Sequence, residues 1–205
     1  MTEKSPLCMD LFECGAVKFG VFTLKSGLKS PIYIDLRPIV SHPKILKRVA
    51  RELKEIAQPL EFDRVAGIPY AAIPIATALS LETNWPMIYT RKEIKEYGTR
   101  KQIEGEFKEG ETVLVVDDLI TTGSSKFDVI QPLQEAGLLV KDIAVLIDRE
   151  QGGKEELAKK DLKLHAVLTI SELLETLYED EKITPHQYAD IKTYFSNPEK
   201  WGVYK

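Results

Sequence analysis

The sequence predicts an α/β protein in which helices cover a central, mostly parallel sheet. Three short segments carry this prediction: a short strand at 64–67, and continuous runs of β-branched or other apolar residues at 113–116 and 143–147. Such runs are typical of strands that are buried on both faces, as in parallel sheets. The first two lead through turn residues into segments that can form helices, as parallel strands require.

The composition is that of one folded domain of 205 residues, with 43% hydrophobic and 29% charged residues. The formal net charge of −4 argues against a nucleic-acid binder, which usually presents a basic face. No apolar run approaches the roughly 18 residues of a membrane span, and the first 14 residues do not read as a signal peptide. Two cysteines are too few for a disulfide framework, so we expect a reduced, cytoplasmic protein.

The first forty residues predict a helix and a hairpin. Residues 6–14 form a short apolar helix candidate, which Ser5 can cap. Residues 19–27 and 29–37 have the β-branched and aromatic residues of two strands, with residues 26–31 as the turn.

The next block predicts helices and strands in alternation. A helix runs from Pro43 to about Gln58, capped by Ser41. It is followed by a strand at 64–67, a tight turn at 67–71, a helix at 73–81 and a strand at 86–89.

Residues 90–105 lack a sustained apolar period and are strongly charged, which predicts an exposed, mobile loop. A plain solvated loop is one interpretation. The alternative is a cover for an anionic leaving group, because cations gather here. They are Arg91, Lys92, Lys95, Arg100 and Lys101.

Residues 113–125, V-L-V-V-D-D-L-I-T-T-G-S-S, combine a buried strand, two acids and a turn rich in hydroxyls before a helix at 126–136. Backbone N–H groups and hydroxyls at a helix N-terminus form an anion site, most naturally for a phosphate. Asp117 and Asp118 would repel a phosphate, so they are expected to hold sugar hydroxyls or a Mg²⁺ ion. The alternative is a capped helix after an acidic strand end, but the combination favours a site for a phosphorylated sugar.

The last block predicts a strand at 143–148. Arg149 follows its carboxyl end and is therefore expected on the same rim of the sheet as the two acids. Pro132 is expected to kink or interrupt the preceding helix. The three histidines, His42, His165 and His186, show no ligand spacing. A strand at 164–169 and helices at 171–178 and 185–195 complete the chain, the last starting at Thr184.

The segment V-V-D-D-L-I-T-T-G-S resembles the phosphoribosyl-diphosphate (PRPP) signature of type I phosphoribosyltransferases. Three other segments are similar to motifs of orotate phosphoribosyltransferases: F-T-L-K-S-G with S-P-I-Y-I-D, R-K-E-I-K-E-Y-G, and D-R-E-Q-G-G. The segment R-K-E-I-K-E-Y-G is most similar to the transferase domain of UMP synthases, which has tyrosine at this position. No D-x-K-x-x-D pattern of a decarboxylase is present in the chain.

The resemblance implies the type I phosphoribosyltransferase fold, with a hood at 1–40, a PRPP-binding core at 41–170, C-terminal helices at 171–205 and a mobile catalytic loop. It implies transfer of phosphoribose from PRPP to orotate in pyrimidine (UMP) biosynthesis, with Mg²⁺, by a homodimer that shares loop residues. Lys95 and Asp118 would be catalytic. Orotate would bind Lys25, Tyr33, Ile34, Thr121 and Arg149. PRPP would bind Lys25, Tyr70, Ala71, Arg91, Lys92, Lys95, Tyr97, Asp117, Asp118, Leu119, Ile120, Thr121, Thr122, Gly123, Ser124 and Ser125.

Two alternatives remain open from the sequence. One is a phosphoribosyltransferase for another base, such as a purine. The other is a non-catalytic PRPP sensor that binds nucleic acid or a partner protein.

Overall fold

The computed structural model describes residues 5–24, 27–91, 102–196 and 201. The chain folds into two compact units. One unit combines the two ends of the chain, Met1–Ile45 and Ile170–Lys205, and the other is the middle segment Leu46–Thr169.

The middle unit is built on a six-stranded sheet with the order β5-β4-β3-β6-β7-β8. Neighbouring strands are parallel except for the short antiparallel pair of β4 and β5. The predicted, mostly parallel sheet is therefore confirmed. The strands are β3 (Arg64–Gly67), β4 (Met87–Thr90), β5 (Ile103–Glu104), β6 (Thr112–Ile120), β7 (Leu139–Asp148) and β8 (Lys163–Thr169).

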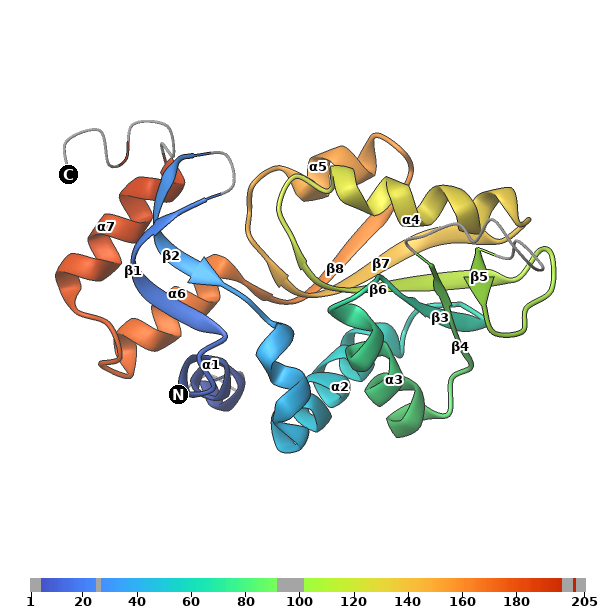
Figure 1. Cartoon of the computed structure of the whole chain (residues 1–205), viewed down its shortest axis with the longest axis horizontal. Coiled ribbons are helices and arrows are strands. Elements are labelled where there is room, and N and C mark those ends of the chain that lie inside the picture. Colours follow the sequence, from blue (N-terminus) through green and yellow to red (C-terminus); the bar gives the residue numbers. More distant parts are fainter. Residues whose placement is uncertain (1–4, 25–26, 92–101, 197–200, 202–205) are drawn as a thin grey trace. The chain divides into compact units, whose positions relative to one another are not determined.

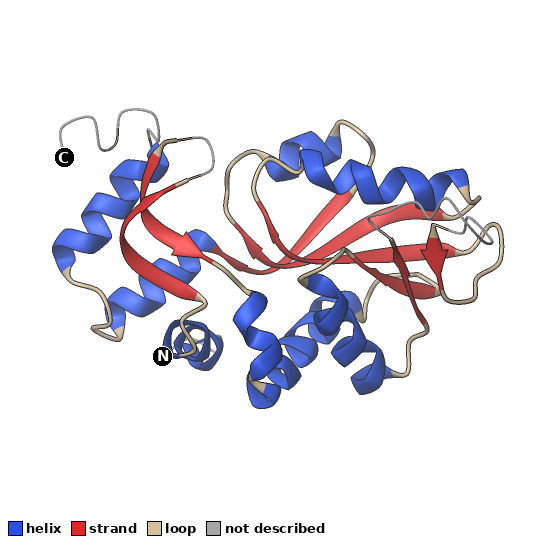
Figure 2. Ribbon diagram, viewed as in Figure 1, coloured by secondary structure: helices blue, strands red, loops and turns tan. Residues whose placement is uncertain are grey.

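Helices cover both faces of this sheet (Figures 1 and 2). α4 (Ser124–Glu135) and α5 (Gly153–Ala158) lie on one face, and α3 (Ala72–Thr83) lies on the other with most of α2 (Pro43–Ala57). Covering both faces explains why the β6 run from Val113 to Val116 is fully buried and carries no polar residue. Ile130 and Leu133 of α4 complete the core on their side.

The direction of winding reverses between β3 and β6. From β3 the chain passes through α3 to β4 on one side, whereas from β6 it passes through α4, β7 and α5 to β8 on the other. In open α/β sheets, ligands bind beyond the carboxyl ends of the strands at such a switch point. The topology therefore directs attention to the residues that follow β3 and β6.

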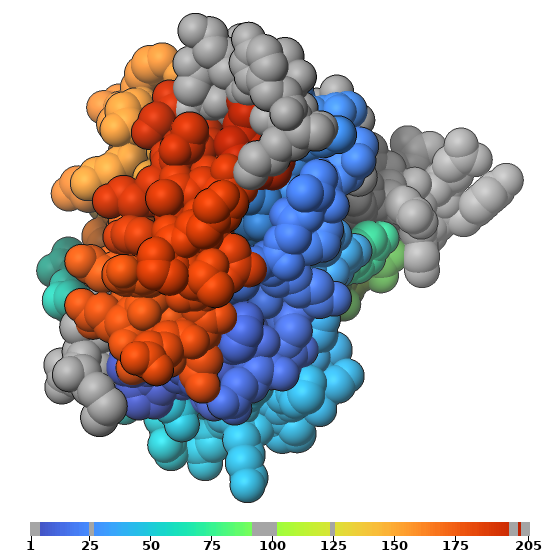
Figure 3. Space-filling model, turned by 90° about the vertical axis from the view of Figure 1, so that its left-hand side faces the viewer, coloured from blue at the N-terminus to red at the C-terminus, as the bar shows by residue number. Residues whose placement is uncertain are grey.

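The other unit joins an N-terminal hairpin to the C-terminal helices. Its elements are α1 (Ser5–Glu13), β1 (Val17–Thr23), β2 (Lys29–Ile34), the 3₁₀-helix η1 (Arg37–Ser41), α6 (Ile170–Glu179) and α7 (Pro185–Ser196). Figure 3 shows the C-terminal helices beside the N-terminal segment. A hydrogen bond of 3.0 Å from the Ser5 hydroxyl to the Asp180 carboxylate joins the two ends of the chain.

Several element boundaries differ from the sequence prediction. The first strand of the hairpin ends at Thr23 and the second begins at Lys29, before the predicted turn at 26–31 ends, and the Leu24 N–H donates to the Leu28 carbonyl at 2.8 Å. Ser30 and Pro31 belong to β2, because the strand pairing shifts register between Phe19 and Phe22 and accommodates a proline without a donor.

Two further elements were not predicted. Residues 103–104 of the expected loop form β5, and α5 begins at Gly153. Pro132 lies inside α4 as predicted but does not interrupt it, because one missing N–H in the last turn leaves the helix to continue to Glu135. Among the described residues, no helix is both long enough and apolar enough to span a membrane.

Candidate active site

The carboxyl end of β6 extends beyond its neighbour β3. The last paired residues are Gly67 and Val116, after which the Ile68 N–H donates to the Val116 carbonyl at 3.0 Å. From Asp117 to Ile120, β6 pairs with β7 on its other side. The turn after β3 and the end of β6 are thus held together at the switch point, and Asp117 and Asp118 lie in the strand itself and not in a corner after it.

Asp117 is almost completely buried, with 3% of its surface exposed, and it forms an ion pair with Lys126. Its Oδ2 contacts the Lys126 ammonium, and its Oδ1 accepts the Asp118 N–H at 2.8 Å. The same ammonium donates to the Leu119 carbonyl at 2.8 Å. The ion pair links the end of β6 to the first turn of α4.

Asp118 is half-buried and accepts the Leu119 N–H at 2.8 Å. Burial, and secondly the negative charge of Asp117, raise the pKa of the Asp118 carboxyl to about 7. A carboxyl with a pKa near neutrality can gain or lose a proton under working conditions, which is a property of acid–base groups.

The turn between β6 and α4 comprises Thr121, Thr122 and Gly123. Gly123 precedes the first helical residue and adopts a φ of +81°, which glycine takes without steric cost. The helix starts at Ser124, as the anion-site prediction requires, because its first-turn N–H groups have no partner within the helix. The side chains of Ser124 and Ser125 lie outside the part of the chain that is described.

The loop after β7 is in direct contact with this turn. The Arg149 N–H donates to the Ile120 carbonyl at 3.0 Å. Gly153 lies so close that a Cβ on it would be 2.6 Å from the Thr121 carbonyl oxygen. The Arg149 backbone is therefore held against the end of β6 at Ile120, on the rim of the sheet where the sequence predicted it. Burial also raises the pKa of the preceding Asp148.

The turn after β3 carries Tyr70 and Ala71. It leads tightly into α3, because a Cβ on Gly67 would lie 2.9 Å from the Cβ of Ala76. The Tyr70 side chain is 64% exposed. Like the β6 turn, this turn ends at a helix N-terminus.

Arg91 follows β4 at the same rim of the sheet, with β3 between it and β6. Its N–H donates to the Gln102 carbonyl at 2.7 Å, and its guanidinium forms an ion pair with Glu104 of β5. These contacts join the two ends of the segment 92–101. Lys92, Lys95 and Tyr97 fall within that segment and lie outside the described residues, as does Lys25.

Tyr33 and Ile34 belong to β2 of the other unit. Tyr33 is 36% exposed, and its ring lies 5.5 Å from that of Phe22. The exposed ring is available to a ligand, whereas Ile34 is half-buried opposite Val17.

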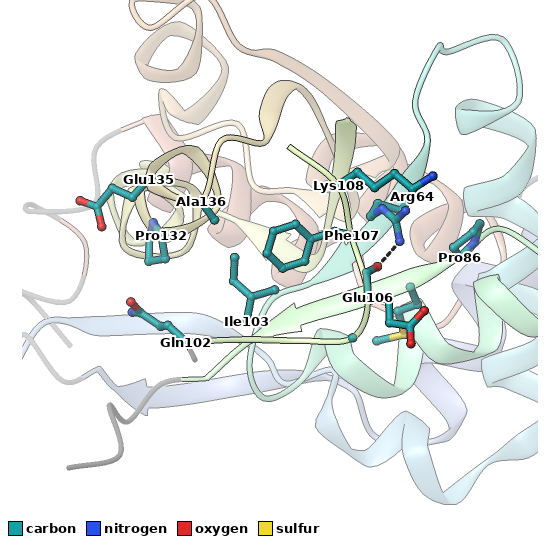
Figure 4. A pocket seen from close by; sticks show the side chains of 12 residues that line it. Arg64, Pro86, Gln102, Ile103, Glu106, Phe107, Lys108, Pro132, Glu135 and Ala136 are labelled. Carbon is teal, nitrogen blue, oxygen red and sulfur yellow. Dashed lines mark hydrogen bonds between the residues drawn. The ribbon is translucent and has the colours of Figure 1, made fainter. Parts of the chain in front are cut away.

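A cavity of about 980 Å³ lies at the other end of the sheet (Figure 4). Its lining includes Arg64 and Met87, at the amino ends of β3 and β4, and Pro132 in the last turn of α4. Arg64 is engaged there by Glu111 at 2.6 Å and by the Glu106 carbonyl. The lining includes neither the two acids nor the turn after β6, but it does include Gln102, whose carbonyl accepts the Arg91 N–H.

Sequence reasoning missed two residues of the site. Lys126 was placed in a helix without a role, although a cation in a first helical turn opposes the helix dipole and is a detectable signal. Gly153 is part of D-R-E-Q-G-G, but no pattern in the sequence indicates that it contacts Thr121.

A sequence profile of the phosphoribosyl transferase domain matches residues 37–169. The chain is 45% identical over 174 residues to the orotate phosphoribosyltransferase of Pyrococcus furiosus, covering 84% of this chain and 96% of that protein. The chain spans only 39% and 40% of the first curated relatives it matches, a bifunctional enzyme of Nostoc and the UMP synthase of Bos taurus.

Solved structures agree with this similarity. The Leishmania donovani UMP synthase superposes with a TM-score of 0.88 at 43% identity, covering 95% of this chain and 42% of that one. The Mycobacterium tuberculosis orotate phosphoribosyltransferase in complex with PRPP has a TM-score of 0.71 at 27% identity, covering 84% of this chain and 99% of that one.

Proposed function

Because this chain belongs to the orotate phosphoribosyltransferase family, we propose that it transfers the 5-phosphoribosyl group of PRPP to orotate. The products are orotidine 5′-monophosphate and pyrophosphate, and the step belongs to de novo pyrimidine (UMP) biosynthesis. The observation that carries the proposal is the arrangement at the switch point, where the loop of Arg149 contacts the end of β6 and the hydroxyl-bearing turn that follows its two acids.

The turn and the two acids are proposed to bind the phosphoribosyl group. N–H groups and hydroxyls of Thr121, Thr122, Gly123, Ser124 and Ser125 surround the 5-phosphate, as expected at a helix N-terminus. Asp118 serves the ribose and has a catalytic role, with Asp117 in support. Leu119 and Ile120 contribute their backbone, and the turn at Tyr70 and Ala71 receives the diphosphate.

For displacement at the anomeric carbon, the protein must neutralise charge on the leaving group and position the two reactants. Arg91, Lys92 and Lys95 neutralise charge on the departing pyrophosphate, with Lys95 as the main catalyst and Tyr97 as an orienting group. Lys25, Tyr33, Ile34, Thr121 and Arg149 position orotate, for which the planar guanidinium of Arg149 suits carbonyl and carboxylate groups.

The donor set of the site fits a Mg²⁺ ion that PRPP carries. The described residues contain no group of three carboxylate, histidine or cysteine side chains that could hold a metal by themselves. Mg²⁺ is commonly held by one or two carboxylates, substrate phosphates and water. Asp118, and secondarily Asp117, would be its protein ligands, and the ion would neutralise diphosphate charge.

We also propose a cytoplasmic homodimer and one transferase domain formed by residues 1–205.

The test is consumption of orotate, followed by its ultraviolet absorbance. Purified protein is mixed with orotate, PRPP and Mg²⁺, beside a control without PRPP. We expect loss of absorbance only when PRPP is present. PRPP binding without orotate loss would discard the acceptor, and a purine that is consumed instead would identify a different transferase.

The loop assignment has its own test in Lys95→Ala. We expect turnover to fall about 100-fold, because leaving-group charge is no longer neutralised, while the Kd for PRPP changes by less than about fivefold. Lys108→Ala is the matched control, since Lys108 is exposed and lies beside the cavity at the other end of the sheet. Unchanged turnover in Lys95→Ala would refute the loop assignment.

A further inference from the structure

We propose that Lys126 is a positioning residue of the PRPP site, which acts through Asp117 and leaves Asp118 as the carboxylate that meets the ligand. The inference deepens the proposed function and rests on it. It gives the two adjacent acids different roles: Asp117 pairs with Lys126 inside the protein, and Asp118 faces the ligand.

The position of Lys126 is unfavourable by itself. Only 8% of its side chain is exposed, and it lies in the first turn of α4, where the helix dipole disfavours a cation. A buried ammonium needs an ionic partner and further hydrogen bonds to be tolerated. Asp117, with 4% of its side chain exposed, and the Leu119 carbonyl supply both.

The contacts of Lys126 fall on both sides of Asp118. Its ammonium binds the side chain of Asp117 and, at 2.8 Å, the carbonyl of Leu119. The Asp118 carboxyl remains close enough to Asp117 for the negative charge of Asp117 to raise its pKa, but it is less buried than Asp117. Because Lys126 ties both sequence neighbours of Asp118 to α4, it fixes the direction of the Asp118 carboxylate. It also fixes the start of the turn formed by Thr121, Thr122 and Gly123, which we call the phosphate turn.

The oxygens of Asp117 are already engaged. Oδ2 contacts Lys126, Oδ1 accepts the Asp118 N–H at 2.8 Å, and 3% of the residue is exposed. Each oxygen could accept a further hydrogen bond, but so little of Asp117 is exposed that a ribose hydroxyl has little access to it. Asp118 is half-buried and presents more of its carboxylate.

A double-mutant cycle tests the proposal on PRPP binding, measured by calorimetry with Mg²⁺ and without orotate. Lys126→Met is expected to raise the Kd for PRPP at least tenfold. Adding Asp117→Asn to Lys126→Met should change the Kd by less than a further twofold, because both substitutions break the same pair. If the increases in Kd of the two single variants multiply in the double variant, Lys126 contacts PRPP directly and the proposal is overturned. A Kd for Lys126→Met within twofold of that of the unsubstituted protein would also overturn it.

The kinetic readout separates positioning from loss of folded protein. We expect the KM for PRPP to rise with the Kd, while the KM for orotate stays within twofold. A lower kcat with both KM values unchanged would indicate only a smaller folded fraction and would overturn the proposal. Lys159→Met is the matched control, because it breaks an exposed pair with Glu156 in the same unit.

A single substitution can leave Asp117 as an unpaired buried charge and prevent folding. In that case Lys126→Met/Asp117→Asn is compared with Asp117→Asn alone. An equal Kd supports the proposal, and a further tenfold loss overturns it. If the unsubstituted protein binds PRPP but does not consume orotate, the proposed function fails while the cycle still tests the role of Lys126.

Discussion

Replacing Gly153 by alanine tests whether the loop after β7, called here the base loop (residues 149–153), supports the phosphate turn, which is Thr121, Thr122 and Gly123. The backbone of Gly153 is not in the left-handed region, so alanine can adopt its conformation and only space is at issue. The new Cβ would lie 2.6 Å from the Thr121 carbonyl oxygen and 2.7 Å from the Ile120 side chain. Ordinary contact begins at 3.4 Å, so the turn and α5 must separate by about 0.8 Å (3.4 minus 2.6).

Two effects of different size follow from that displacement. Overpacking typically costs about 1–3 kcal/mol of unfolding free energy, which lowers the Tm of a chain of this length by roughly 2–12 °C. A misplacement of about 1 Å at a site that positions two reactants can cost about 100-fold in rate. We therefore expect kcat/KM to fall between about 10- and 100-fold, at a temperature where the variant is fully folded.

Gly152→Ala is the matched control at the neighbouring position. Gly152 has a φ of +88° and a Cβ added there would have no atom within 4 Å, so alanine strains the backbone without pushing on the turn. A left-handed alanine costs about 1–2 kcal/mol, so a similar loss of Tm with nearly normal kcat/KM is expected. The orotate absorbance assay and thermal unfolding measure both variants. A folded Gly153→Ala variant with kcat/KM within twofold of normal would refute the reasoning.

Two further predictions concern titration and stability. Because the pKa of Asp118 is raised to about 7 in the folded protein, its ionisation reduces stability as pH rises from the ordinary carboxyl range to about 7. Without ligand, Asp118→Asn should therefore raise the Tm more at pH 8 than at pH 4.5, and an equal change at both values would contradict the assignment. Immediately before α7, the Thr184 hydroxyl accepts the Gln187 N–H at 3.2 Å, and the Gln187 side chain accepts the Thr184 N–H at 2.9 Å. Thr184→Ala should cost about 1 kcal/mol in urea unfolding with unchanged kcat, whereas no loss would mean that this cap contributes nothing.

The sheet was the most predictable part of the molecule. Arg64–Gly67 was predicted at its observed bounds, because Val65–Gly67 is a short apolar run that leads into a turn with glycine and proline. The start of α4 was also foreseen within two residues, since Gly123 and the hydroxyls mark a helix N-terminus. These elements are specified by local chemistry.

Elements stabilised mainly by their neighbours were not foreseen. β5 has two residues, and its pairing with β4 depends on Tyr89 and Thr90 and not on any pattern of its own. α5 begins at Gly153 and has six residues, too few for a helical period to be read. The hairpin turn was misplaced because Pro31 reads as a turn residue, whereas the irregular register of β1 and β2 gives it a place in the strand.

The candidate site also has a part that the sequence predicted and a part that it did not. The rim of the sheet, and therefore the group of Asp117, Asp118 and Arg149, followed from topology, because carboxyl ends of parallel strands share one edge. Its internal contacts depend on register. Ile120 of β6 pairs with Asp148 of β7, which places the Arg149 N–H within 3.0 Å of the Ile120 carbonyl and sets Gly153 against Thr121.

A one-residue slip in that register would separate the phosphate turn from the base loop, although every strand would keep its composition. Hydrophobic alternation usually fixes the register of a sheet, but Val113–Val116 of β6 and Ile143–Ile147 of β7 are apolar on both faces and carry no such alternation. The polar residues that end the strands are the remaining source of register. The buried pair of Lys126 and Asp117 ties the end of β6 to α4, the helix that leads into β7. We therefore expect the residues of this pair to contribute to the alignment of the two strands as well as to the direction of Asp118.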